Sequence, residues 1–367
     1  MNSKLNNINS LLEKSSFDGI ILNPGETLKY ITGLDFHLME RPVLLFITKH
    51  FLPLFILPEL EKGKLSQLKF DYQFETYSDE KGALETALGK VSEKININET
   101  TFCVESTKFR FLETEFINNS FPNIHLRSAD EFLQDLRICK SNDELEKVSK
   151  AITIAENALK ETIKIIKIDV SENDIANELT YQLIKAGSSI DLPFPPIVAS
   201  GPNSANPHAA PSNRKLKSED MLIIDWGARF QGYASDITRT FAIGSISDEM
   251  KNIYQIVKLA NQSARDAARS NIPAKLLDKS ARVIINAAGY EKEFMHRTGH
   301  GLGLEAHEYP YITSENSYLL KPGNLFTIEP GIYLKGIGGV RIEDDVVITS
   351  NGSETLTSLN RDLFIIE

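Results

Sequence analysis

Cysteine is scarce in this chain: only Cys103 and Cys139 occur among its 367 residues. Two thiols cannot supply the disulfide framework on which small secreted domains depend. Neither cysteine lies near the cluster of histidines in the sequence, which argues against a Cys/His metal site. We expect both to be buried structural thiols of a protein that works in the reducing cytoplasm.

The chain also lacks a long apolar run and an excess of positive charge. Its first residues are polar and contain no apolar stretch typical of a secretory signal. The most apolar segment, residues 42–58, is interrupted by Thr48, Lys49 and His50, which predicts two short strands around a turn and not a membrane span. A formal net charge of -10 gives little electrostatic support for a nucleic-acid partner. These features favour a cytoplasmic protein that acts without membrane or nucleic acid.

The length of the chain allows two domains of ordinary size. In the first part, short apolar runs such as FDGIIL, PVLLFIT and TFCVES alternate with amphipathic stretches, which is typical of a small α/β domain. A different pattern begins around the segment DEFLQDLRICK, which we expect to form a connecting helix. We therefore predict an N-terminal α/β domain over residues 1–132 and a larger α+β domain over residues 133–367.

Two capping boxes predict the first helices of the larger domain, because each precedes a long amphipathic run. The boxes are formed by Ser141 with Glu144 and by Ser171 with Asp174. Two further helices are expected at about residues 247–271 and 273–289. The rest of this domain has short apolar runs separated by glycine and proline, which predicts antiparallel hairpins.

Two of the predicted hairpins carry four carboxylates. In MLIIDWGARFQGYASDITRTFAI, a turn in the FQG segment places Asp225 nearly opposite Asp236. In FTIEPGIYLKGIGGVRIEDDVVIT, a turn at Gly336 places Glu329 nearly opposite Glu343. Opposed residues of a hairpin share one face, and their Cβ atoms lie about 4.5–5.5 Å apart. Each hairpin is thus predicted to present a pair of acids on one side.

Like charges directly opposite each other destabilise an ordinary sheet. Two such pairs beside apolar strand residues indicate a buried acidic cluster, which needs compensating positive charge. Four carboxylates balance the charge of two divalent cations, so the pattern predicts a dinuclear metal site. The alternative is that these acids are solvated at the edges of the hairpins.

Histidines point to the same domain, which contains four of the seven: His208, His296, His300 and His307. The glycines in GHGLG allow backbone or a ligand to approach His300 closely. The spacing of His296 and His300 could suggest a helical zinc pair, but these glycines disfavour a helix and no glutamate follows His296. From this group we expect only His300 to be a metal ligand.

The segments NPHAAP, IIDWGARFQGYASDITRT, HRTGHGLGLEAHEYP, TIEPGIY and GGVRIEDD together resemble the pita-bread-fold metallopeptidases of the Xaa-Pro dipeptidase (prolidase) and aminopeptidase P branch. The resemblance covers about residues 140–367. The N-terminal part resembles the smaller creatinase-type domain of that branch. The resemblance implies a pita-bread fold for the larger domain, a peptide substrate and a homodimer.

The resemblance also implies a role for each matching residue. Asp225 would hold the first metal, His300 and Glu329 the second, and Asp236 and Glu343 would bridge both. The substrate would contact His208, His296, His307, Tyr333 and Arg341. The catalytic residues would be His208, His307, Glu329 and Arg341.

The expected reaction is hydrolysis of the bond before proline in Xaa-Pro dipeptides, with release of the N-terminal residue. Glu329 would accept a proton from the attacking water, while His307, helped by His208, would stabilise the oxyanion or move protons. Manganese is the first choice of metal because carboxylates dominate the site, with cobalt, iron or zinc as alternatives. Two other functions stay open: an Xaa-Pro aminopeptidase acting on longer peptides, and a non-catalytic peptide-binding member of the fold.

Overall fold

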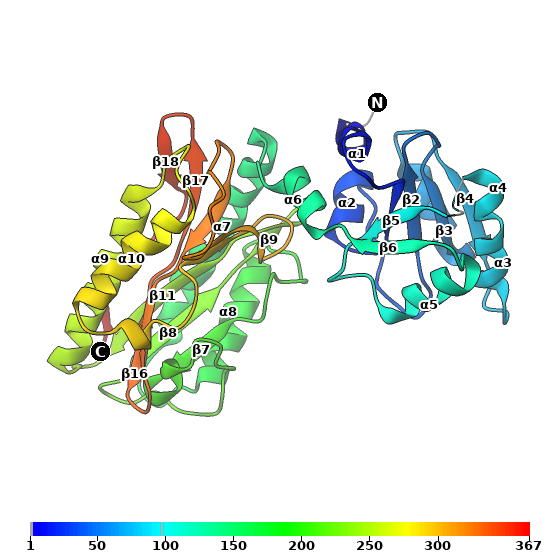
Figure 1. The fold of residues 1–367 in the computed structure, drawn as a ribbon. Helices are drawn as coiled ribbons and strands as arrows, with labels where there is room; N and C mark the ends of the chain where they lie inside the picture. Colours follow the sequence, from blue (N-terminus) through cyan, green and yellow to red (C-terminus); the bar gives the residue numbers. More distant parts are fainter. Residues whose placement is uncertain (1–2, 96, 98) are drawn as a thin grey trace. The chain divides into compact units, whose positions relative to one another are not determined.

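The computed structural model describes residues 3–95, 97 and 99–367, and the chain divides into two compact units, Met1–Arg137 and Ile138–Glu367 (Figure 1). The division follows α6 (Asp130–Arg137), whereas the expected boundary between residues 132 and 133 would cut that helix. The helix stays with the first unit because Leu133 and Leu136 are buried in its core.

A mixed sheet with the strand order β4-β3-β2-β1-β5-β6 forms the centre of the first unit. Successive side chains point to opposite faces, so Ile20 and Leu22 enter one apolar core while Ile21 enters the other. The strands are β1 (Gly19–Leu22), β2 (Leu44–Thr48), β3 (Leu54–Pro58), β4 (Gln73–Tyr77), β5 (Thr101–Val104) and β6 (His125–Ser128). The predicted α/β class of this unit is confirmed.

Helices cover both faces of this sheet. The core that contains Ile20 is completed by residues of α1, α2 and α6, and the core that contains Ile21 by residues of α3, α4 and α5. Besides α6, the helices are α1 (Ser3–Glu13), α2 (Glu26–Thr32), η1 (Glu59–Gln67), α3 (Ala83–Gly89), α4 (Val91–Lys94) and α5 (Phe111–Ser120).

The second unit consists of mostly antiparallel sheets between two helix pairs, and only the β11–β19 pair among its described strands is parallel (Figure 1). A four-stranded sheet has the order β19-β11-β8-β7 and a five-stranded sheet the order β13-β12-β14-β17-β18; β9 pairs with β10 and β15 with β16. The strands are β7 (Ile197–Ser200), β8 (Met221–Trp226), β9 (Arg229–Phe230), β10 (Tyr233–Ala234), β11 (Ile237–Ile243), β12 (Gly299–Gly301), β13 (Glu308–Ile312), β14 (Leu325–Ile328), β15 (Gly331–Leu334), β16 (Gly338–Arg341), β17 (Asp344–Thr349), β18 (Gly352–Thr355) and β19 (Phe364–Ile366). The unit has the predicted α+β class.

Both predicted capping boxes begin helices of this unit. Ser141 caps α7 (Asn142–Thr162) and Ser171 caps α8 (Glu172–Lys185), each with its side chain and backbone bonded to the third helical residue. The other predicted pair is α9 (Asp248–Ala267) and α10 (Lys275–Ala287), whose buried faces join the strands in one apolar core. Short 3₁₀ turns are η2 (Ile163–Ile165), η3 (Gly201–Ala205) and η4 (Glu291–Glu293).

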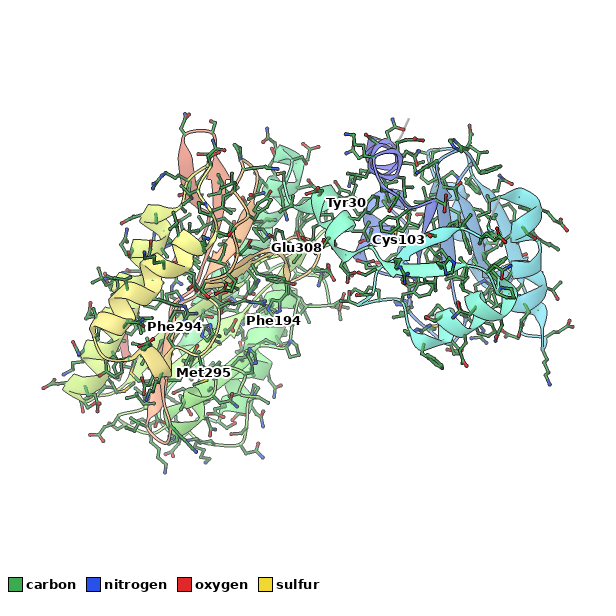
Figure 2. The ribbon with its side chains drawn as sticks, viewed as in Figure 1. Tyr30, Cys103, Phe194, Phe294, Met295 and Glu308 are labelled. Carbon is green, nitrogen blue, oxygen red and sulfur yellow. The ribbon has the colours of Figure 1, made fainter. Side chains whose placement is uncertain are left out.

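The two cysteines differ in environment. Cys103 lies in β5 within the core of the first unit, and burial raises the pKa of its thiol to about 12 (Figure 2). Cys139 is exposed, so the prediction that both thiols are buried is wrong for this residue. It forms an isolated bridge with the buried Asn324, whose amide donates to Cys139 Sγ at 3.3 Å, while its neighbours Ile138 and Lys140 are buried. No helix in the described part of the chain is long and apolar enough to cross a membrane.

Candidate metal centre

The first acid-bearing hairpin runs from β8 to β11, and its register differs from the prediction. Gln231 and Gly232 form a two-residue turn with φ of 48° and 90°, the left-handed conformations that tight hairpins require. The resulting ladder pairs Asp225 with Thr238 and not with Asp236. The shift is two residues, and side-chain direction repeats every two residues, so Asp236 remains on the same face as Asp225.

The second hairpin has the predicted register. β15 pairs with β16 across a three-residue turn centred on Gly336, and β14 pairs with β17 in the same register. Glu329 and Glu343 lie in the break between these two ladders. They are therefore opposite each other, but their backbones are free to bond elsewhere: Glu343 N donates to Thr238 O at 3.1 Å in the first hairpin. This bond joins the two acid-bearing hairpins.

His300 is the middle residue of β12, a strand that lies between β13 and β14. A side chain at Gly299 would place its Cβ 1.9 Å from Thr327 O, and one at Gly301 would place it 2.4 Å from Tyr309 O. The glycines thus allow the neighbouring backbones to approach closely, as predicted. They also leave His300 as the one large side chain of this strand, buried beside the acids.

The structure brings the five predicted ligands together in two groups that share Glu343: Asp225, Asp236 and Glu343 in the first, and His300, Glu329 and Glu343 in the second. In each group the possible ligand atoms lie within 4.8 Å of one another. His300 Nε2 is 3.6 Å from Asp236 Oδ2 and 3.4 Å from Glu329 Oε1. Two atoms that bind one ion at about 2.1 Å each lie within about 4.2 Å of one another, so these separations fit a shared ion.

A third group contains Asp236, His300 and His307. His307 thus lies close enough to be considered as a ligand, although the sequence predicted only His300. Its residue is exposed, and its ring centroid is 4.0 Å from that of His300. Partial burial and the nearby Arg297 charge lower the pKa of His307 to about 4, which leaves it neutral at pH 7.

The donor set fits divalent cations. Asp225 Oδ1 and Glu343 Oε1 are buried and have no hydrogen-bond partner among the described residues. Burial, and then repulsion from Glu343, raises the pKa of Asp236 well above its usual range, and burial raises that of Glu329 to about 7. Buried carboxylates in this state need a cation to ionise fully.

The tautomer of His300 also suits a metal ligand. Its Nδ1 lies 3.1 Å from Gly301 O, so Nδ1 carries the hydrogen and donates it to that carbonyl. Burial keeps the pKa of His300 well below its usual value, so the ring is neutral. The lone pair on Nε2 therefore faces the oxygens of Asp236 and Glu329, an arrangement that a cation between them would stabilise.

A chain of hydrogen bonds leads away from Asp225. Arg341 donates from Nη2 to Asp225 Oδ2 at 2.7 Å and from Nη1 to the Tyr333 hydroxyl at 2.8 Å. That hydroxyl is 2.8 Å from His296 Nε2, while His296 Nδ1 is 2.7 Å from Arg297 O. His296 Nδ1 therefore donates to the carbonyl and Nε2 accepts from Tyr333. Burial and then the Arg341 charge lower the pKa of His296 to about 3, in agreement with a neutral ring.

His208 is the predicted site residue that comes from a loop. It is exposed and follows η3, and it lies close enough to His296 and His307 to interact with both rings. Arg341 Nη1 also donates to the carbonyl of the neighbouring Pro207 at 3.3 Å. The loop thus places His208 on the open side of the acid cluster, where a substrate can reach it.

Two residues around the cluster were not predicted. Thr238 Oγ1 donates to Glu343 Oε2 at 2.6 Å and accepts from Arg341 Nε at 3.1 Å, so one hydroxyl orients two site residues. Asp345, fully buried, accepts from the backbone N–H of Asp236 at 3.2 Å. The only sequence signal for Asp345 was its place in the run IEDD. Side chains alternate between the two faces of a strand, so Asp345 is expected on the same face as Glu343, two residues earlier.

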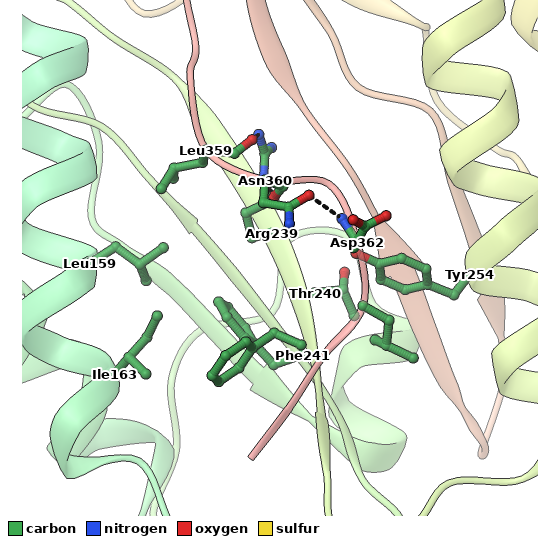
Figure 3. Close-up of a pocket in the computed structure, with 11 residues that line it drawn as sticks. Leu159, Ile163, Arg239, Thr240, Phe241, Tyr254, Leu359, Asn360 and Asp362 are labelled. Carbon is green, nitrogen blue, oxygen red and sulfur yellow. Dashed lines mark hydrogen bonds between the residues drawn. The ribbon is translucent and has the colours of Figure 1, made fainter.

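A cavity of about 180 Å³ lies elsewhere in this unit (Figure 3). None of the predicted site residues in the described part of the chain lines it. Its walls come from α7, β11, α9 and the C-terminal segment. Arg239 is its link to the cluster, since its guanidinium lines the cavity and Nη1 donates to Glu343 O at 2.6 Å.

Comparison with known proteins agrees with this site. The model of metallopeptidase family M24 matches residues 146–350, and that of the creatinase/prolidase N-terminal domain matches residues 4–139. The chain therefore belongs to metallopeptidase family M24, and its second unit has the pita-bread fold of that family. The predicted family and the predicted class of enzyme are confirmed.

Individual relatives match over the full length of the chain. An Xaa-Pro dipeptidase of Lactobacillus helveticus is 33% identical, with 99% of this chain and 98% of the relative covered. A prolidase structure from Thermococcus sibiricus has a TM-score of 0.94 at 35% identity, covering 99% and 98% of the two chains. An X-Pro aminopeptidase structure from Thermotoga maritima has a TM-score of 0.85 at 32% identity, covering 99% of each chain.

Proposed function

We propose that this protein hydrolyses Xaa-Pro dipeptides with two divalent cations held by the five predicted ligands: Asp225, Asp236, His300, Glu329 and Glu343. The observation that carries the proposal is the pair of ligand groups that share Glu343, in a chain whose full-length relatives include Xaa-Pro dipeptidases. Bound in this site, two divalent cations would polarise a carbonyl oxygen and lower the pKa of a water molecule. Manganese is the first candidate because oxygen ligands dominate.

The side chains around the ligands have separate proposed tasks. Glu329 accepts the proton of the attacking water, since it lies at the junction of the acids and the histidines. His307 and His208, both exposed on the open side, contact the scissile carbonyl and stabilise its developing negative charge. Proline nitrogen has no hydrogen in the peptide bond and must gain one to leave, so one of these neighbouring groups must deliver a proton.

Arg341, Tyr333 and His296 form the wall on the other side of Asp225. The direct contact of Arg341 with Asp225 Oδ2 fixes the carboxylate so that its Oδ1 is left for a cation. Tyr333 and His296 are neutral donors and acceptors at pH 7, because burial raises the pKa of Tyr333 to about 12 and lowers that of His296 to about 3. We propose that they contact the substrate through their remaining surfaces. A cytoplasmic location is a further part of the proposal. So is a homodimer, which rests on the family resemblance.

The second candidate function is an Xaa-Pro aminopeptidase that accepts longer peptides. It is favoured by the structural similarity to the X-Pro aminopeptidase from Thermotoga maritima. The two activities differ in whether the site is closed beyond the proline, where a dipeptide ends in a carboxylate. A non-catalytic binding protein is disfavoured because all five ligand positions are present.

The test is a substrate panel with manganese: Ala-Pro and Met-Pro, Ala-Ala and Met-Ala, and Ala-Pro-Xaa tripeptides. An ordinary dipeptide presents an amide hydrogen to a pocket built for proline, and an unpaired buried polar group costs about 1–3 kcal/mol. We therefore expect kcat/KM for Xaa-Pro to exceed that for Xaa-Ala at least about tenfold. Equal rates on both series would refute proline specificity, and faster cleavage of tripeptides than of dipeptides would favour the aminopeptidase.

A further inference from the structure

A single buried carboxylate joins the two ends of the loop that carries His208. These two ends, at Ser200 and Ser212, form the neck of the loop. This carboxylate belongs to Glu172, the first residue of α8, which is 0% exposed. The loop leaves β7 at Ser200 and returns at Ser212. Its two ends meet at Glu172, which lies far from the acid cluster in sequence and belongs to no part of the site described so far.

The contacts of Glu172 use both of its oxygens fully. Oε1 accepts from Ser200 N and Ser200 Oγ, both at 2.7 Å, and from Asn203 Nδ2 at 3.1 Å. Oε2 accepts from Asn203 Nδ2 at 3.1 Å, from Ser212 N at 3.1 Å and from Ser212 Oγ at 2.6 Å. All six bonds come from the two ends and the first turn of the loop. The start of a helix is also a favourable place for a negative charge.

The far part of the same loop is held by the site itself. Ser204 Oγ accepts from Gly339 N at 2.8 Å, and Pro207 O accepts from Arg341 Nη1 at 3.3 Å. His208 follows directly. With its neck fixed by Glu172 and its tip fixed by β16, the loop has little freedom to move His208 relative to the cluster.

We propose that Glu172 is a positioning residue, which fixes the His208 loop so that the imidazole stays beside the scissile bond. This inference rests on the proposed function, in which His208 contacts the scissile carbonyl. Glu172 touches neither substrate nor metal ligands. Its effect on the reaction passes through the loop, and its loss leaves the metal site intact.

The first test is Glu172→Gln, with Asp174→Asn as the matched control. The amide that this substitution introduces has a hydrogen-bond donor where Ser200, Asn203 and Ser212 all donate, so the neck should open. Asp174 lies on the same helix turn, and its carboxylate accepts from Ser171 in the capping box. The control thus makes the same chemical change at the end of the same helix without touching the loop.

We expect Glu172→Gln to lower kcat on Ala-Pro at least about tenfold, the effect of one unpaired buried group, and to leave bound metal unchanged. Asp174→Asn should keep kcat within about twofold, in the range of an exposed capping residue. In the His208→Ala background, Glu172→Gln should have no further effect on kcat, because the imidazole that Glu172 positions is already absent. Additive losses in the double variant, or unchanged kcat in Glu172→Gln, would overturn the proposal.

A second measurement separates this inference from the proposed function. The NMR signal of the His208 imidazole should shift or broaden in Glu172→Gln and not in Asp174→Asn. An inactive wild-type protein on every Xaa-Pro substrate would refute the proposed function, and the imidazole signal would then decide the positioning role alone. An unchanged signal overturns it. Should Glu172→Gln fail to fold, Ser212→Ala, which removes one donor and keeps the carboxylate, is expected to show the same effects in smaller size.

Discussion

Arg341 Nη2 lies 2.7 Å from Asp225 Oδ2, so one oxygen of this proposed ligand is bound by a guanidinium while the other has no partner among the described residues. The side chain of Arg341 is 3% exposed and that of Asp225 13%. The two residues come from different hairpins and join β16 to β8. A carboxylate held this way has a fixed orientation, with Oδ1 left without a protein partner.

Arg341→Gln is expected to lower kcat at least about tenfold while both metal ions stay bound. The substitution removes a positive charge beside an acidic cluster, which favours cation binding, but it frees Asp225 to rotate. Kinetics on Ala-Pro together with elemental analysis check this. Tyr333→Phe is the comparison, since it keeps the bond from Arg341 to Asp225 and removes only the hydroxyl that lies between Arg341 and His296. Release of metal by Arg341→Gln would contradict the prediction.

Asp236→Ala is expected to lose both metal ions and nearly all activity, because Asp236 is the proposed bridge between the two ligand groups. His208→Ala should keep two ions per chain and lose turnover. Asp248→Ala, at an exposed position of α9, is the control and should change neither. If His208→Ala released metal, His208 would have to be counted among the ligands.

The metal-free protein is expected to become less stable as pH rises from about 6.5 to 8. Burial, with mutual repulsion, raises the pKa of Asp236 and Glu343 well above the usual range, and that of Glu329 to about 7. A group with a raised folded-state pKa contributes stability below its unfolded pKa and loses it as pH passes the folded value. Unfolded carboxylates are ionised throughout this window. Unfolded histidines, with an ordinary pKa of about 6.5, release their remaining protons in its lower part, which offsets only part of the loss.

Thermal unfolding with EDTA and with manganese checks this. The metal-free Tm should fall by at least about 2 °C across the window, while the metal-bound Tm should not, since ligands bind the ion only when deprotonated. Glu329→Gln removes one of the titrating groups, so its metal-free Tm should fall less than that of the wild type. A metal-free Tm that rises over this range would show that the carboxylates are already ionised without metal.

Lys140→Met is expected to destabilise the second unit by about 3–5 kcal/mol, the usual cost of leaving one partner of a buried ion pair uncompensated. Lys140 Nζ contacts Glu308 Oε1, and the two side chains are only 2% and 6% exposed. Chemical denaturation measures the effect. Lys164→Met breaks the pair with Glu161, which is 50% exposed, and should change stability little. Equal effects of both substitutions would contradict the importance of burial.

The two hairpins show how far sequence patterns determine a site. Glycine at position 336 marked the centre of the second turn, so the register of Glu329 and Glu343 followed correctly. In the first hairpin the turn is centred between Gln231 and Gly232, which moved the register by two residues. The error did not change the predicted face of Asp236, because side-chain direction depends only on whether a shift is odd or even.

Other features could not be predicted because they depend on partners far apart in the chain. Thr238 is one of two threonines in β11, and its contacts with Glu343 and Arg341 are what place it in the site. Cys139 is exposed between the buried residues Ile138 and Lys140, and its partner Asn324 lies 185 residues later in the chain. Strand β4 has mostly half-buried side chains, and its sequence QFETY has no continuous apolar run of the kind seen in PVLLFIT and TFCVES.

The proposed ligands are spread along the chain from Asp225 to Glu343 and meet through the bond between Glu343 N and Thr238 O. During synthesis, therefore, no nascent chain can bind both ions before residue 343 has left the ribosome. Until then the chain has only part of the proposed ligand set, because Glu343 belongs to both ligand groups that make up the site. Binding of both metal ions would thus occur only after the second unit is complete. An incomplete chain would have no peptidase activity and could not cleave neighbouring peptides.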